Sequence, residues 1–368
     1  RRGGAGRLDR YRIDLVPLGQ VSASCARTHC VAGAHYSKRR LDSEKPAAVS
    51  NQPPARIARA IAGFLLSTLS ACVSLPQSDA LLHEGGAGLP PHVQLDAVAF
   101  FAQEEYQCGP AALAMSLNAA GIDTRPAALA EQVFLPARKG SLQVEMLAGA
   151  RRHGLLAYRL APELRDVLAE IAADNAVIVL QNLGLFASRP YWHYAVVIGY
   201  DLEKNTILLH SGSKARRTMS FSLFERLWID GGRWAMLALP PGRTPASARE
   251  AQYAGAAAAL EQTGRVAAAH LAYAALLERW PANLAGLMGL GNTAYALGRG
   301  ADAEAAFRSA TVRHPQSAAA FNNLAQTLAD QGKFDAALAA ARNAVRLGGP
   351  ELPIAQATLD QIKAHTRK

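Results

Sequence analysis

Cys108 and His193 are the residues whose types and surroundings best fit a catalytic pair. Cys108 directly precedes Gly109-Pro110 and a run of small and apolar residues, a pattern that predicts a buried helix beginning near the cysteine. Because the positive end of the peptide dipoles favours thiolate, this position predicts a lowered thiol pKa and a nucleophilic role. His193 begins an apolar run that predicts a strand, and an imidazole there can take up and return the thiol proton near neutral pH.

These residues resemble the papain-like cysteine peptidases that remove double-glycine leaders from bacteriocins. The resemblance lies in Gln103 with the Cys108-Gly-Pro motif, in the run His193-Tyr-x-Val-Val-x-Gly-Tyr-Asp and in residues 224–228, and it covers about residues 95–240. It implies an α+β domain with a helix packed on an antiparallel sheet. It also implies hydrolysis through a cysteine thioester, with His193 as base and then acid. By position, Gln103 takes the family's role of hydrogen-bond donor to the oxyanion.

The third catalytic position departs from that family, which usually orients its histidine with the aspartate of an Asp-Pro pair in the next strand. This sequence has Leu-Leu-His-Ser-Gly at 208–212. A hairpin turning near 201–204 brings His210 and Ser211 opposite His193, so either side chain can orient the imidazole, and neither is an anion. Without a carboxylate beside it, the imidazolium of His193 is less stable, which is expected to slow hydrolysis. Alternatively, the reaction does not need this carboxylate, because the thiolate of Cys108 stabilises the imidazolium as an ion pair.

The surrounding patterns predict a mixed α+β domain over residues 93–240. Four helices are expected from proline and glycine positions and apolar spacing, at 109–121, 126–133, 142–153 and 162–173. Four strands rich in Val, Ile and aromatic residues are expected at 176–180, 194–200, 206–210 and 234–239. A Pro-rich linker is predicted at 241–249.

The rest of the chain repeats with a 34-residue period. Four columns of residues share this step: Gly264, Gly298 and Gly332; Ala269, Ala303 and Ala337; Pro281 and Pro315; Tyr273, Phe307 and Ala341. The period and residue types resemble the tetratricopeptide repeat, a pair of antiparallel helices. We expect three repeats over 250–349, which form an all-α solenoid with a capping helix at 350–368 and bind a protein partner or deliver substrate.

The amino-terminal region has the layout of an export signal. Residues 56–72 contain two arginines, a short apolar stretch and then Leu-Ser-Ala-Cys, which resembles the lipobox of bacterial lipoproteins. This predicts lipidation of Cys72, a tether over 73–92 and a membrane-anchored protein in the cell envelope that faces the periplasm. Val73, which is not an aspartate, favours the outer membrane. Residues 1–55 are expected to be unfolded or not translated, with translation starting near Val49.

Charge and residue spacing exclude several functions. The formal net charge is +10, but residues 1–59 hold 12 Lys/Arg and four Asp/Glu, so the other 309 residues carry 27 basic and 25 acidic groups. This near-neutral balance leaves little excess positive charge for binding a nucleic-acid partner. The histidines lack metal-ligand spacing and no phosphate-cradling glycine loop is present, so no metal or cofactor is expected.

The sequence therefore supports one leading hypothesis and two alternatives. The leading one is a cell-envelope cysteine peptidase acting on a peptide or protein substrate. The first alternative is a catalytically weak or inactive peptide-binding scaffold, in which Cys108 titrates as an ordinary thiol near ~8.5. The second is an amidase or acyltransferase that acts on cell-wall peptides through the same thiol.

Overall fold

The structure is a computed structural model that describes residues 75–184 and 189–367. The predicted signal segment 56–72 with Cys72, and the region 1–55, lie outside the described residues. Among those that are described, no helix combines the length and the apolar character needed to cross a membrane.

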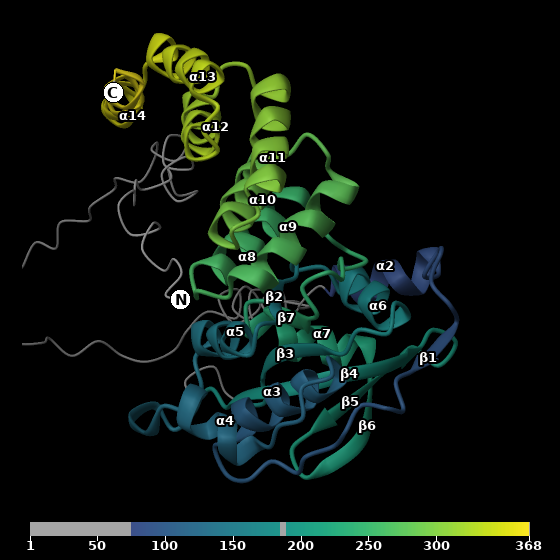
Figure 1. The fold of residues 1–368 in the computed structure, drawn as a ribbon. Helices are drawn as coiled ribbons and strands as arrows, with labels where there is room; N and C mark the ends of the chain where they lie inside the picture. Colours follow the sequence, from purple (N-terminus) through teal and green to yellow (C-terminus); the bar gives the residue numbers. More distant parts are fainter. Residues whose placement is uncertain (1–74, 185–188, 368) are drawn as a thin grey trace, which may run out of the picture. The chain divides into compact units, whose positions relative to one another are not determined.

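An antiparallel sheet forms the centre of the first domain (Figure 1). Within the described residues it has seven strands in the order β2-β7-β3-β4-β5-β6, and β1 pairs with β4. The strands are β1 (His92–Gln94), β2 (Leu156–Arg159), β3 (Val177–Asn182), β4 (Trp192–Asp201), β5 (Thr206–Ser211), β6 (Lys214–Ser220) and β7 (Ala235–Leu239). The sequence predicted β3, β4, β5 and β7 but not the three others.

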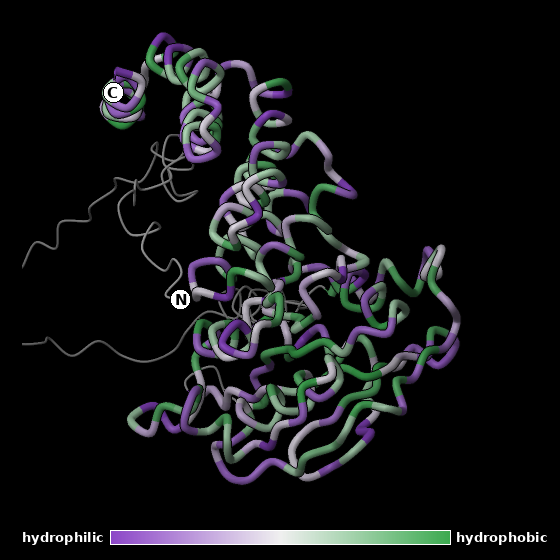
Figure 2. The backbone as a smooth tube through the Cα atoms, viewed as in Figure 1, coloured by the Kyte–Doolittle hydropathy of each residue, from purple (hydrophilic) through white to green (hydrophobic). Residues whose placement is uncertain are grey.

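Helices cover this sheet and complete its core. They are α2 (Pro76–Glu84), α3 (Cys108–Ala119), α4 (Pro126–Val133), α5 (Gln143–Arg152), α6 (Leu164–Ala172) and α7 (Phe221–Asp230). Helix α3 is the central one, because every residue from 109 to 117 is buried against the sheet, including β4. Figure 2 shows the hydrophobic character of these packed segments. The predicted α+β fold class, with a helix on an antiparallel sheet, is confirmed.

The second part of the chain is a run of paired helices. They are α8 (Glu250–Glu261), α9 (Val266–Arg279), α10 (Leu284–Ala296), α11 (Gly300–Arg313), α12 (Ala318–Asp330), α13 (Phe334–Leu347) and α14 (Leu352–Thr366). The glycines at 264, 298 and 332 have positive φ angles of 75°, 73° and 75°, so each ends its turn in a conformation that L side chains rarely adopt. The predicted solenoid is confirmed.

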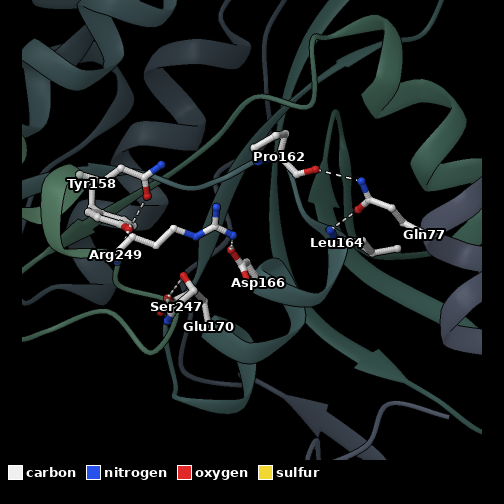
Figure 3. Close-up of polar contacts among 9 residues, drawn as sticks. Gln77, Tyr158, Pro162, Leu164, Asp166, Glu170, Ser247 and Arg249 are labelled. Atoms are coloured by element: carbon white, nitrogen blue, oxygen red, sulfur yellow. Dashed lines mark hydrogen bonds and ion pairs between the residues drawn. The ribbon is translucent and has the colours of Figure 1, made fainter. Parts of the chain in front are cut away.

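The tether prediction for 73–92 is wrong in part, because α2 docks on the first domain. The carboxylate of Glu225, which is fully buried, accepts hydrogen bonds from the backbone N–H and hydroxyl of Ser78, both at 2.7 Å. The Gln77 amide donates to the Pro162 carbonyl and accepts from the N–H of Leu164 at the start of α6 (Figure 3). These partners lie far away in the sequence, so a local pattern does not reveal them.

The predicted linker 241–249 is likewise held in place. The buried Glu170 carboxylate accepts from the backbone N–H of Ser247 at 2.7 Å and from that of Ala246 at 3.2 Å. Arg249 pairs with Asp166 at 3.1 Å, and Figure 3 shows the two side chains facing each other. Helix α6 therefore anchors both the segment before the first domain and the segment after it.

Candidate active site

Cys108 is the first residue of α3 and lines the cavity described below. The chain enters this helix through Tyr106, which has a positive φ of 63°. Gly109 follows the cysteine, and a Cβ atom added there would overlap the side chain of Ser141. Glycine therefore allows the start of the helix to approach the loop before α5 closely.

Burial governs the protonation of this thiol. Cys108 is half-buried, and loss of solvent raises its pKa, whereas hydrogen bonding from the backbone N–H groups of Tyr194 and Gly109 lowers it by less. The lowered pKa predicted from the helix dipole is therefore wrong in direction. The raised pKa favours the protonated thiol.

His193 lies near the start of β4 and is only 5% exposed. Its Nε2 atom lies 3.0 Å from the hydroxyl oxygen of Ser211, a neighbour on β5. Nδ1 is therefore the ring nitrogen left to exchange a proton with a nucleophile. Burial, and then the positive charge of Arg217, lower the pKa of His193 to about 4. The Tyr191 ring stacks at 6.4 Å from the imidazole.

The structure corrects the candidate third residue from His210 to Ser211. His210 uses Nε2 on the Val98 carbonyl at 3.1 Å, and its Nδ1 accepts from the backbone N–H of Arg216 at 3.2 Å. In the sheet register His210 pairs with Val196, whose side chain points to the face opposite that of His193. His210 is therefore a structural residue of the core, and Ser211 is the neighbour that contacts the imidazole.

Gln103 is fixed beside the same strand. Its Oε1 accepts from the N–H of Gly212 at 2.9 Å, and its Nε2 donates to the carbonyl of Tyr194 at 3.1 Å. A backbone bond from Gln103 N to Gly212 O at 3.0 Å holds the chain in this position. Because Nε2 carries two hydrogens, the amide retains a second donor, and Gln103 lines the cavity that contains the thiol.

One cavity of about 910 Å³ joins Cys108, His193 and Gln103. Exposed aromatic and aliphatic side chains line it, and an acidic pair and a basic pair stand at its edges. These residues are Tyr106, Tyr191, Trp192, Leu142 and Val144, the pair Glu104 and Glu105, and the pair Arg138 and Lys139. A cavity of this size with both apolar and charged walls suits a peptide segment. Among the described residues, no cluster of His, Cys, Asp and Glu is arranged to hold a metal.

Sequence reasoning missed two contributors to the cavity. One is the backbone N–H of Tyr194, which faces the Cys108 thiol and has no side-chain signature. The other is Tyr191, which stands two residues before His193 and stacks on its ring. An aromatic residue at that spacing along a strand places its ring on the face of the histidine, so this signal was present in the sequence.

The Peptidase C39-like family matches residues 90–236, and a tetratricopeptide repeat family matches residues 253–318, 288–351 and 322–366. No curated protein matches the chain.

Solved structures with similarity to the chain fall into two groups. A C39-like peptidase from Bacillus anthracis is 18% identical, with 41% of this chain and 98% of that chain covered and a TM-score of 0.34. The type III secretion translocator chaperone SycD of Yersinia enterocolitica is 21% identical, with 32% of this chain and 86% of that chain covered and a TM-score of 0.31.

Proposed function

We propose that this chain, which carries a Peptidase C39-like domain followed by tetratricopeptide repeats, is a cysteine peptidase that hydrolyses peptide bonds through a thioester on Cys108. The observation that supports the proposal is the shared cavity, which is lined by the Cys108 thiol at the start of α3, the imidazole of His193 and the amide of Gln103. The 3.0 Å contact between His193 Nε2 and Ser211 fixes the ring with Nδ1 available for the thiol proton.

The direction of both pKa shifts defines the first chemical step. Because burial raises the pKa of Cys108 and lowers that of His193, the resting pair is a thiol and a neutral imidazole. His193 therefore takes the proton as the sulfur attacks the carbonyl carbon, which is general-base catalysis without a preformed ion pair. The Gln103 amide donates to the carbonyl oxygen as negative charge develops there.

The same groups complete the reaction. The imidazolium of His193 gives its proton to the leaving amine as the C–N bond breaks, which leaves an acyl group on the sulfur of Cys108. Neutral His193 then removes a proton from water, the resulting hydroxide equivalent attacks the thioester, and the thiol is released protonated. The neutral Ser211 stabilises the transient imidazolium less than a carboxylate does, so a slow enzyme is expected.

A peptide library tests the proposal. The full chain is incubated with a proteome-derived peptide library, and new termini are read by mass spectrometry. We expect cleavage by the wild type, loss of cleavage in Cys108→Ala and His193→Ala, and normal cleavage in His92→Ala, a matched variant of a histidine whose side chain is 59% exposed. Cleavage that persists unchanged in Cys108→Ala refutes the mechanism.

A second candidate is a peptide-binding module that does not hydrolyse its ligand. The neutral residue at the third position and the raised pKa of Cys108 favour it. It predicts peptides that bind the wild type without cleavage and without forming an acyl group on Cys108. Incubation with purified wall fragments, followed by product mass, distinguishes an amidase or acyltransferase from both.

We also propose that the protein is exported and lipid-anchored at Cys72, on the basis of the signal-like residues 56–72. Radiolabelled palmitate incorporation in the wild type and its loss in Cys72→Ala test the anchor. We further propose that the repeats bind a protein partner or substrate.

A further inference from the structure

A second cavity lies where the first domain meets the first repeat helix. Its volume is about 410 Å³. Its wall is formed by α5, the end of β2, the turn before β7 and α8, which contribute Leu147 and Arg151, Ala157 and Arg159, Gly232 and Arg233, and Gln252, Gly255 and Ala256. The volume falls within the usual range of small-molecule sites. None of the groups in the catalytic mechanism lines this cavity, so it is a separate site.

Of the residues that the structure describes, three arginines and no acidic residue line this cavity. Arg151 is the most informative of them, because its Nε is buried without a hydrogen-bond partner. Among the described residues Arg151 forms no ion pair within 4.0 Å, and loss of solvent lowers its pKa. A half-buried guanidinium without an anion is costly, so the site is suited to receive one.

Arg233 is a second arginine whose guanidinium group has a nitrogen without a hydrogen-bond partner. Its Nη2 lies 3.4 Å from a carboxylate oxygen of Glu225, but its Nε is buried without a partner. The same carboxylate already accepts three hydrogen bonds from Gln77 and Ser78 at the start of α2. These donors are neutral, so the ion pair with Arg233 remains, and the group that Arg233 still lacks a partner for is its Nε–H.

Helix α8 provides a wall that leaves space for a ligand. A Cβ atom added at Gly255 would meet nothing within 4 Å, so the cavity is open at this position. The Oε1 atom of Gln252 accepts a hydrogen bond from the Tyr158 hydroxyl at 2.9 Å, which holds the side chain in place. Its amide NH2 group can still donate hydrogen bonds to a ligand. Both domains thus contribute groups that can contact one anion.

We propose that this cavity binds a phosphate group, held by the guanidinium groups of Arg151, Arg159 and Arg233. Three cations with planar arrays of donors match the several oxygens and the double negative charge of a phosphate monoester better than a single carboxylate. The phosphate belongs either to a free small molecule, as a monoester with up to two negative charges, or to a phospholipid headgroup, as a diester with one, and in both cases the guanidinium groups contact the phosphate oxygens. The proposal is independent of peptide hydrolysis.

Inorganic phosphate is the first probe. Calorimetric titration of the full chain at constant ionic strength, in a buffer without phosphate, is expected to show saturable binding by the wild type. Arg151→Gln removes one charge-assisted contact and should weaken binding about tenfold or more. Gly255→Leu keeps every charge but fills the open space, and it should weaken binding similarly. Thermal melts verify that each variant is folded.

Arg342→Gln is the matched control, because it removes the same charge from an exposed position on α13. It should bind phosphate as the wild type does. The proposal is overturned if Arg151→Gln and Gly255→Leu bind as tightly as the wild type, or if Arg342→Gln weakens binding equally.

Vesicles distinguish the two sources of phosphate. Co-sedimentation is measured with phosphatidylglycerol vesicles and with phosphatidylcholine vesicles. Vesicle binding that Gly255→Leu abolishes supports a headgroup, and saturable binding of inorganic phosphate without vesicle binding supports a small molecule. If neither probe binds the wild type, the proposal is wrong.

Discussion

Ser211→Asp tests most directly whether His193 and Cys108 exchange a proton. The Ser211 hydroxyl oxygen lies 3.0 Å from Nε2 of His193, so an aspartate there places a carboxylate beside the imidazole. At about 4 Å and an effective dielectric constant of about 20, this attraction is worth about 4 kcal/mol. Because the site is only 4% exposed, desolvation of the carboxylate offsets part of it. We expect the pKa of His193 to rise by about 1 to 3 units.

The raised imidazole pKa should activate the thiol. An imidazolium next to Cys108 stabilises thiolate, so alkylation of Cys108 at pH 7 should become about tenfold faster or more. The assay is the rate of iodoacetamide alkylation from pH 5 to 10. Because the chain has four cysteines and one tryptic peptide holds both Cys72 and Cys108, the rate is followed by mass spectrometry after cleavage at glutamate, which places Cys108 alone in the segment 106–131.

Ser211→Asn serves as the matched control, since it has a similar size and a hydrogen-bonding oxygen but no charge. It should leave the pH profile near that of the wild type. If Ser211→Asp and Ser211→Asn give the same profile as the wild type, the imidazole does not govern the thiol and the proposed pair is incorrect.

Three further predictions concern stability, each measured by thermal or denaturant unfolding of the full chain. Glu170→Gln removes a buried carboxylate that accepts several hydrogen bonds, and it should lower the free energy of unfolding by about 2 kcal/mol. Because the pKa of His193 is about 4 in the folded state against an ordinary 6.5, the unfolded chain takes up the proton first. Stability should therefore fall by about 3 kcal/mol as the pH drops from about 6.5 to about 4, and His193→Gln should abolish this component. Gly289→Ala forces a Cβ into the Tyr273 ring and should cost about 1 to 3 kcal/mol, whereas Gly255→Ala, with open space, should stabilise by about 0.5 to 1 kcal/mol. Equal effects of the two glycine variants would contradict the packing argument.

Local sequence signals predicted the elements that are regular in themselves. Helix α3 and strand β4 have apolar residues along nearly their whole length, and the repeats are set by glycines at fixed intervals. Strand β6 was missed because its sequence, Lys-Ala-Arg-Arg-Thr-Met-Ser, is basic and mostly exposed. It is a strand because it pairs with β5, which is a tertiary effect.

The sequence was enough to predict which residues form the site, but not how the strands that carry them pair. The sequence placed Cys108 before a helix and His193 at a strand, and the fold brings both to one cavity. Whether His210 or Ser211 faces the imidazole depends on strand register, and β4 carries an irregularity between Val197 and Gly199 that no sequence pattern marked. The pKa of the thiol could not be predicted either, because its burial outweighs the favourable effect of the backbone N–H groups.

The most direct measurement is the mass of Cys108 during turnover. The full chain is mixed with the peptide library, quenched in acid and cleaved at glutamate, and the segment 106–131, which contains Cys108 without Cys72, is analysed. The account predicts an acyl group on this cysteine whose mass matches the amino-terminal part of a cleaved peptide. Cleavage without any acyl group on Cys108, and with undiminished rate in Cys108→Ala, would contradict it.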